Sequence, residues 1–132
     1  MSGPLEAAAI HTPEAPGPTN GAPYSQAVRY GEMIFVSGQL PIDPATRTLV
    51  DGGIEVQTER VMRNLEAVLR AAGSDIEKML RVTVYLRRRD DWPAMNDVFR
   101  RFVGRVPPAR TALVVGEMSF DASIEIDCIA YV

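Results

Sequence analysis

The sequence predicts an α+β domain in which two helices pack on one face of a β-sheet, with the element order β-β-α-β-α-β-β. The chain has 132 residues, 46% of them hydrophobic and 23% charged, which is ordinary for a soluble globular domain with one core. Apolar residues alternate with polar ones in some segments and recur every three or four residues in others, which are the periods of strands and helices. Because only two helices interrupt the strands, we expect both on one face of the sheet.

Residues 1–22 are predicted to form a mobile N-terminal segment, and residues 23–132 a single folded domain. Residues 1–23 hold five of the ten prolines, three glycines, two glutamates and no Lys or Arg. Such a segment buries too little apolar surface to offset the entropy lost on ordering. We therefore expect at least its first dozen residues to be mobile.

Two strands are expected between Ser25 and Leu40, with a turn at residues 30–32. Pro41 and residues 43–46 then end the second strand in a turn.

Two helices are predicted from apolar stripes. The first stripe steps by four and three residues and ends before Gly73, a natural helix stop. Its members are Ile54, Thr58, Val61, Leu65, Val68 and Ala72. The second helix is expected over about residues 91–103, with Pro93 in its first turn and Pro107 and Pro108 beyond its end. Its stripe consists of Met95, Val98, Phe99 and Phe102.

Three more strands complete the expected order, at residues 80–87, about 109–117 and about 123–132. Strict alternation in the first of them places Leu80, Val82, Val84 and Leu86 on one face. In the last strand, one side carries Ile124, Ile126, Cys128 and Ala130, and the other carries Glu125, Asp127, Ile129 and Tyr131. Two helices cover only one face of the sheet, so we expect a second subunit to cover part of the other face and a polar pocket to occupy the rest.

The scarcity of His, Cys and Lys excludes several kinds of site. His11, Cys128 and Lys78 are the single representatives of their types. A zinc site needs three or four ligands, and nucleophilic triads need a well-placed imidazole, so we expect no metal and no Ser-His or Cys-His machinery. The net charge of −3 argues against a nucleic-acid partner. No apolar run is long enough to span a membrane and no signal peptide is recognisable, so the expected location is the cytoplasm.

Arg110 and Glu125 are the main candidates for chemistry. Arg110 begins a strand after two prolines, where its guanidinium could bind a carboxylate through two parallel hydrogen bonds; the alternative is a surface arginine. Glu125 lies between two isoleucines, and partial burial would raise its pKa towards general acid-base use; the alternative is a solvent-facing glutamate. Asp127 lies on the same strand face as Glu125, where it forms either a carboxylate pair or a polar stripe.

Several short segments, in order and at consistent separations, resemble those of one protein family. They are residues 22–28 (APYSQAV), 35–41 (FVSGQLP), 57–58, 64–65, 71–74 (AAGS), 96–99 (NDVF), 108–111 (PART) and 124–130 (IEIDCIA). Together they resemble the RidA/YjgF family of reactive enamine and imine deaminases over about four-fifths of the chain.

The resemblance implies a chorismate-mutase-like fold with a mixed sheet, assembled as a homotrimer with pockets at the subunit interfaces. It also implies a cofactor-independent 2-iminobutyrate/2-iminopropanoate deaminase, which hydrolyses reactive 2-imino acids and their enamine tautomers to 2-keto acids and ammonia. Two alternatives stay open. One is a non-deaminase member that binds a small ligand or RNA, and the other is an aminoacrylate hydrolase dedicated to one pathway.

Residue roles follow from the same resemblance. Arg110 matches the arginine that binds the substrate carboxylate, and Glu125 matches the carboxylate that orients water or exchanges protons with the imine nitrogen. The remaining matches are residues that line the pocket or lie at its rim: Tyr24, Ser37, Gly38, Asn96 and Ala112, which stands where relatives often have Cys.

Overall fold

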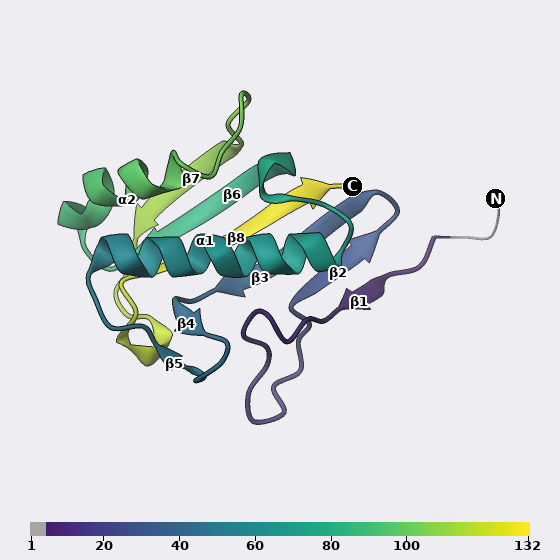
Figure 1. Cartoon of the computed structure of the whole chain (residues 1–132), viewed down its shortest axis with the longest axis horizontal. Coiled ribbons are helices and arrows are strands. Elements are labelled where there is room, and N and C mark those ends of the chain that lie inside the picture. The colour runs from purple at the N-terminus through teal and green to yellow at the C-terminus, as the bar shows by residue number, and fades with distance from the viewer. Residues whose placement is uncertain (1–4) are drawn as a thin grey trace.

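The computed structural model describes residues 5–132 and contains a six-stranded sheet with both helices on one face (Figure 1). The strand order is β1-β2-β3-β8-β6-β7, and β4 and β5 form a separate hairpin. The strands are β1 (Ala8–Ile10), β2 (Ala27–Tyr30), β3 (Met33–Gln39), β4 (Ile42–Asp43), β5 (Thr48–Leu49), β6 (Met79–Leu86), β7 (Ala109–Val114) and β8 (Ile124–Tyr131). The helices are α1 (Ile54–Ala71), α2 (Trp92–Phe99) and the 3₁₀ turns η1 (Ile76–Lys78), η2 (Arg89–Asp91) and η3 (Ser119–Asp121). The predicted α+β class is confirmed.

The sheet is mixed, because β6 and β7 run parallel whereas the other neighbouring strands are antiparallel. The last strand, β8, lies in the middle of the sheet between β3 and β6. Its inward residues, Ile124, Ile126, Cys128 and Ala130, are all buried beneath the helices, as their alternation predicts.

Helix α1 buries the stripe that its sequence predicts. Ile54, Thr58, Val61, Leu65, Val68 and Ala72 are all buried. The helix ends at Ala71, and Gly73 follows with φ +88°, a left-handed conformation that favours glycine.

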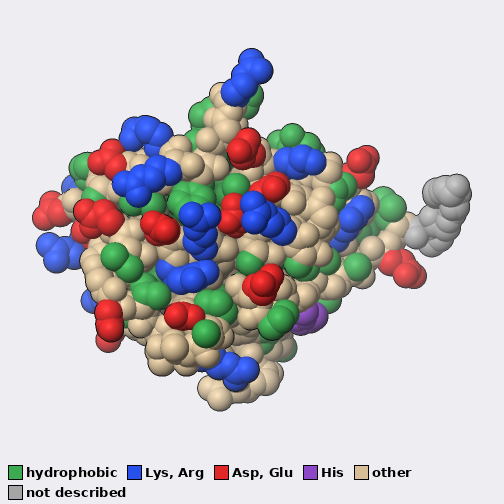
Figure 2. All heavy atoms as spheres, viewed as in Figure 1, with side chains coloured by type: hydrophobic (Ala, Val, Ile, Leu, Met, Phe, Trp, Pro, Cys, Tyr) green, Lys and Arg blue, Asp and Glu red, His purple; other side chains and the backbone are tan. Residues whose placement is uncertain are grey.

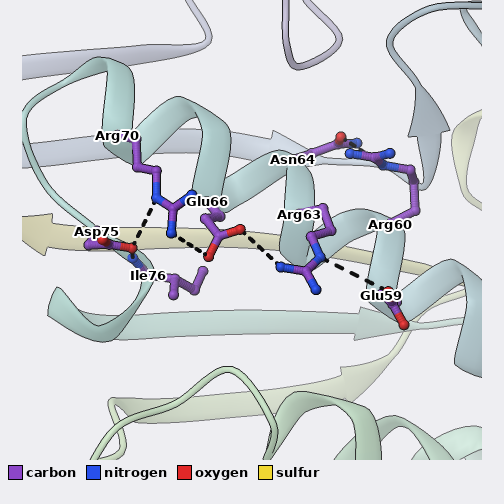
Figure 3. Close-up of polar contacts among 8 residues, drawn as sticks. All are labelled: Glu59, Arg60, Arg63, Asn64, Glu66, Arg70, Asp75 and Ile76. Carbon is purple, nitrogen blue, oxygen red and sulfur yellow. Dashed lines mark hydrogen bonds and ion pairs between the residues drawn. The ribbon is translucent and has the colours of Figure 1, made fainter.

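The solvent side of α1 carries a row of alternating charges (Figure 3). Arg63 lies 3.2 Å from Glu66 and 4.0 Å from Glu59. Arg70 lies 3.2 Å from Glu66 and 3.5 Å from Asp75 just beyond the helix. Pairs of this kind on an exposed face add a few tenths of a kcal/mol each, roughly, and the apolar stripe remains the main support of the helix.

Helix α2 is shorter than predicted. It ends at Phe99, whereas the sequence suggested about Val103. The next turn tightens, because Arg101 and Phe102 donate to carbonyls three residues back, at Val98 and Phe99. Phe102 is nevertheless buried with the predicted stripe.

The prediction that Leu80 shares a face with Val82 is wrong. The pairing of β6 with β8 shifts register between Met79 and Arg81. Met79 is therefore buried at 4% exposure, and Leu80 is 45% exposed. A bulge of this kind moves a side chain to the opposite face without changing the sequence pattern.

The fold begins before Pro23, where the sequence placed its start. Strand β1 pairs with β2 over residues 8–10, and Ala15 is buried in the core. The prediction from composition counted apolar area alone, whereas this segment is held by backbone pairing and by side-chain amide hydrogen bonds. For residues 1–4 the predicted mobility lies outside the described residues.

Within residues 5–132, no helix has the length and apolar content needed to cross a membrane. In the same part of the chain, no three His, Cys, Asp or Glu side chains gather as a metal site would require.

Candidate functional site

The face of the sheet opposite the helices carries the outward residues of β8. Glu125, Asp127 and Ile129 are half-buried there and Tyr131 is exposed, in the alternation that the sequence predicts. Phe35 on β3 is the cross-strand partner of Ile129 and is 45% exposed. This surface, which we call the open face, thus combines a carboxylate pair with exposed apolar side chains.

Glu125 lies directly against Gly38 at the end of β3. A Cβ atom built on Gly38 would overlap Oε2 of Glu125 and lie 3.0 Å from its Cδ atom. The pairing of β3 with β8 shifts register between Val36 and Gln39, and this irregularity places Gly38 beside the carboxylate. Glycine is therefore needed here for close approach.

Ser37 also lies at this irregularity, and its hydroxyl forms a hydrogen bond to the backbone of another segment. Its Oγ donates to the carbonyl oxygen of Ser25 at 2.7 Å, and its backbone N–H donates to the carbonyl of Gln26 at 2.9 Å. Ser37 thus ties the start of β2 to the end of β3, next to Gly38.

The environment of Glu125 favours its protonated form. Burial, and then the negative charge of Asp127, raise the pKa of the Glu125 carboxyl above its usual value. Tyr85 on β6 is the cross-strand partner of Glu125, and its hydroxyl donates to Asp127 at 2.9 Å. That hydrogen bond, together with burial, raises the pKa of Tyr85. The sequence analysis did not predict Tyr85 as a site residue. The only sequence feature that pointed to it was its position on the polar side of β6.

Arg110 points to the other side of the sheet. Its cross-strand partner is Val82, which is buried beneath the helices. The guanidinium lies 5.2 Å from the centre of the Phe99 ring, and its Nη1 lies 3.9 Å from the sulfur of Met95. Partial burial lowers the pKa of Arg110. Among the ion pairs of residues 5–132, none involves Arg110.

Two other predicted site residues lie near Arg110. Ala112 is two residues further along β7 and pairs with Val84, so it shares the strand side of Arg110. Asn96 is partly buried on α2, next to Met95.

The predicted site residues therefore form two groups within one chain. One group contains Glu125, Gly38 and Ser37, at the junction of β3 and β8; Tyr24, which is 51% exposed just before β2, lines a pocket together with Gly38. The other group contains Arg110, Ala112 and Asn96, at the outer edge formed by β7 and α2. Arg110 and Glu125 extend from opposite faces of the sheet, so one chain does not bring them together.

Charges of both signs are interspersed on the helix-bearing face (Figure 2). Two arginines of α1, Arg63 and Arg70, are paired with Glu66, as described above. No continuous basic surface is visible on this face, which does not favour binding to a phosphate backbone there.

Comparison with known proteins identifies the family of this chain. Residues 13–132 match the family described as Endoribonuclease L-PSP. The chain belongs to this family, which includes the RutC and Rid proteins. A RutC family protein of Pyrococcus abyssi is 44% identical over 122 residues, which cover 92% of this chain and 94% of that protein.

Solved structures of similar proteins show the same fold. RidA from an Antarctic Psychrobacter has a TM-score of 0.89 and 34% identity, covering 95% of this chain and 99% of the other. TdcF of Escherichia coli, solved with bound serine, has a TM-score of 0.87 and 29% identity, covering 95% of this chain and 98% of the other. These likenesses confirm the Rid-family resemblance and the mixed-sheet fold expected from the sequence.

Proposed function

We propose that this Rid-family protein hydrolyses short 2-imino acids, such as 2-iminobutyrate and 2-iminopropanoate, to 2-keto acids and ammonia. The observation that carries the proposal is a half-buried glutamate with a raised pKa, Glu125, packed on Gly38 at an exposed surface. A carboxyl group whose pKa is raised in this way is suited to exchange protons with a bound substrate. The serine bound to E. coli TdcF supports a small ligand with a carboxylate.

We further propose that the site is completed by a second copy of the chain in a homotrimer. Arg110 and Glu125 extend from opposite faces of one sheet, so a neighbouring copy must supply one of them if both are to reach the same ligand. In this arrangement Glu125, Gly38, Ser37 and Tyr24 come from one protomer, and Arg110, Ala112 and Asn96 from the next. The exposed apolar side chains of the open face support such contact.

The chemistry requires orientation, one water molecule and proton transfer. Arg110 holds the substrate carboxylate through its guanidinium, which places C2 of the imine at a fixed distance from Glu125. Water attacks C2 of the iminium form of the substrate while the ionised Glu125 takes one proton from the water, forming a neutral carbinolamine. Glu125 then gives this proton to nitrogen. As ammonia leaves, the hydroxyl oxygen becomes the carbonyl oxygen and its proton passes to Glu125, which releases it to the departing ammonia. The overall change adds one water molecule and releases one ammonia, and it uses no redox partner.

The test is a coupled assay in which a threonine dehydratase generates the imino acid and the appearance of keto acid is followed. Wild-type protein is expected to accelerate keto-acid formation, and Arg110→Ala to abolish the acceleration. Arg100→Ala is the matched control, because Arg100 is an exposed arginine paired with Asp97. If wild-type protein leaves the rate unchanged, the proposal is wrong.

A further inference from the structure

The side chain of Arg110 lies against two buried residues of helix α2, at the edge of the sheet where α2 and β7 meet (Figure 1). Phe99 is 6% exposed and Met95 is fully buried. The Cζ atom of Arg110 lies over the Phe99 ring, 5.2 Å from its centre, and Nη1 donates to the Met95 sulfur at 3.9 Å. Both contacts are made within one chain, so they do not depend on a second copy.

These two contacts hold the guanidinium without neutralising it. The face of an aromatic ring attracts a cation through its quadrupole, and a thioether sulfur is only a weak hydrogen-bond acceptor. Neither group carries a negative charge, and Arg110 forms no ion pair within residues 5–132. The guanidinium therefore keeps its charge and its N–H donors for a ligand such as a carboxylate.

Other arginines of the chain are fixed by groups that occupy their donors. Arg29 donates to two backbone carbonyls, at 3.0 and 3.3 Å. Arg70 lies 3.2 Å from the carboxylate of Glu66. A guanidinium held in either way must give up a partner before it can bind a carboxylate through two hydrogen bonds. Arg110, which rests on a ring and a sulfur atom, need not do so.

The pKa of Arg110 is consistent with a cation that has no counter-ion. Partial burial lowers this pKa, whereas a nearby carboxylate would raise it. The guanidinium nevertheless stays charged at neutral pH, as arginine does in proteins generally. A partly desolvated cation attracts an incoming carboxylate more strongly than a fully hydrated one does, because the local dielectric constant is lower.

We propose that Phe99 is a positioning residue of the carboxylate site, whose ring face holds the Arg110 guanidinium in place and leaves its donors to the ligand. This inference rests on the proposed function, because it concerns how the substrate carboxylate is bound. Phe99 acts through Arg110 and supplies no reacting group. A weaker ring face should therefore weaken carboxylate binding and leave the chemical step unchanged.

Fluorination of Phe99 tests the ring face with little change in side-chain shape. Each fluorine withdraws electron density from the ring and so weakens its attraction for a cation. Incorporation of mono-, di- and trifluorophenylalanine at position 99 should raise KM for the imino acid in steps, by roughly threefold or more over the series. The value of kcat should stay close to that of wild type, because Arg110 binds the carboxylate in the ground state and the transition state alike.

Phe102 provides the matched control. It belongs to the same apolar stripe, is 9% exposed, and lies 4.9 Å from the guanidinium of Arg63, which is not among the proposed site residues. The same fluorine series at Phe102 should leave KM unchanged. A purely structural role of Phe99 predicts a lower melting temperature and a smaller active fraction with KM unaltered. An unchanged KM across the Phe99 series, or an equal rise across the Phe102 series, would overturn the inference.

A binding measurement separates the role of Phe99 from the reaction. Calorimetry with 2-ketobutyrate, a product of the proposed reaction, reports carboxylate binding whether or not the protein is a deaminase. The Kd should rise across the Phe99 series by about the same factor as KM and stay constant across the Phe102 series. This pattern in a protein without turnover refutes only the proposed function, and turnover with unchanged Kd and KM refutes only the role of Phe99. A wild-type protein that neither binds the keto acid nor hydrolyses the imine refutes both.

Discussion

The carboxyl group of Glu125 fills the space that a side chain at Gly38 would need. A Cβ atom there would clash with the carboxylate oxygen Oε2 of Glu125. The position of the carboxyl group on the open face is thus set by a glycine on the neighbouring strand. This relationship links the irregular end of β3 to the proposed chemistry, because it fixes where Glu125 can meet a ligand.

Gly38→Ala should displace the Glu125 carboxyl. The added methyl must push that side chain away, and a shift of about 1 Å in a reacting group costs on the order of 10²-fold in rate. We expect kcat to fall by about that factor. The control is Gly116→Ala, since a Cβ at Gly116 meets no atom within 4 Å. Steady-state kinetics of both variants, with melting curves, test this; wild-type kcat in Gly38→Ala would contradict it.

Asp127→Asn should lower the pKa of Glu125. The negative charge of Asp127 opposes ionisation of Glu125, so its removal favours the ionised form. If ionised Glu125 is the base, the acid limb of the kcat/KM profile should move to lower pH. Asp97→Asn, which alters only an exposed pair with Arg100, should leave the limb in place. A limb that does not move in Asp127→Asn argues against Glu125 as the titrating group.

Glu125→Gln should stabilise the fold at neutral pH. The pKa of Glu125 is higher in the folded state than its ordinary value of 4.5, so the folded protein binds more protons at this group than the unfolded chain. Wild-type stability therefore decreases as the pH rises from about that value through the raised pKa. Melting temperatures should favour Glu125→Gln at pH 7 and converge near pH 4. A variant that melts lower than wild type at pH 7 would show that the charge is stabilising.

Gln26→Ala should release the N-terminal segment from the domain. It removes four hydrogen bonds, to part-buried backbone groups of Thr12 and Pro16 and to the buried carbonyl of Ala15, which should cost about 2–3 kcal/mol of unfolding free energy. Amide exchange should accelerate in residues 8–16 first. Glu14→Ala, an exposed change in the same segment, serves as the control. Unaltered protection of residues 8–16 would mean that β1 pairing alone holds the segment.

The periodic parts of the fold could be predicted from the sequence. The α1 stripe and the alternation of β8 each depend on one repeating pattern, and both are confirmed. Leu80 could not be placed, because the register shift at Met79 depends on pairing with β8. Likewise, the Gln26 amide bonds to Thr12, Ala15 and Pro16, a contact between segments that composition does not reveal.

The site residues could be named from motifs but not assembled. Motif spacing along the chain does not tell on which face of a sheet a residue lies. The parallel pairing of β7 with β6 places Arg110 beside Val82 on the helix side, whereas β8 places Glu125 on the open face. This separation makes a second copy necessary for the proposed site.

Complementation between two inactive variants tests that claim most directly. Arg110→Ala and Glu125→Gln are each expected to be inactive alone. Coexpressed in equal amounts, they should form mixed assemblies in which some interfaces combine an intact Glu125 from one chain with an intact Arg110 from the next. Random mixing should restore about one quarter of wild-type activity, because each site draws its two residues from independent chains. If mixed assemblies form, as shown by copurification of differently tagged variants, and no activity returns, the shared site is contradicted.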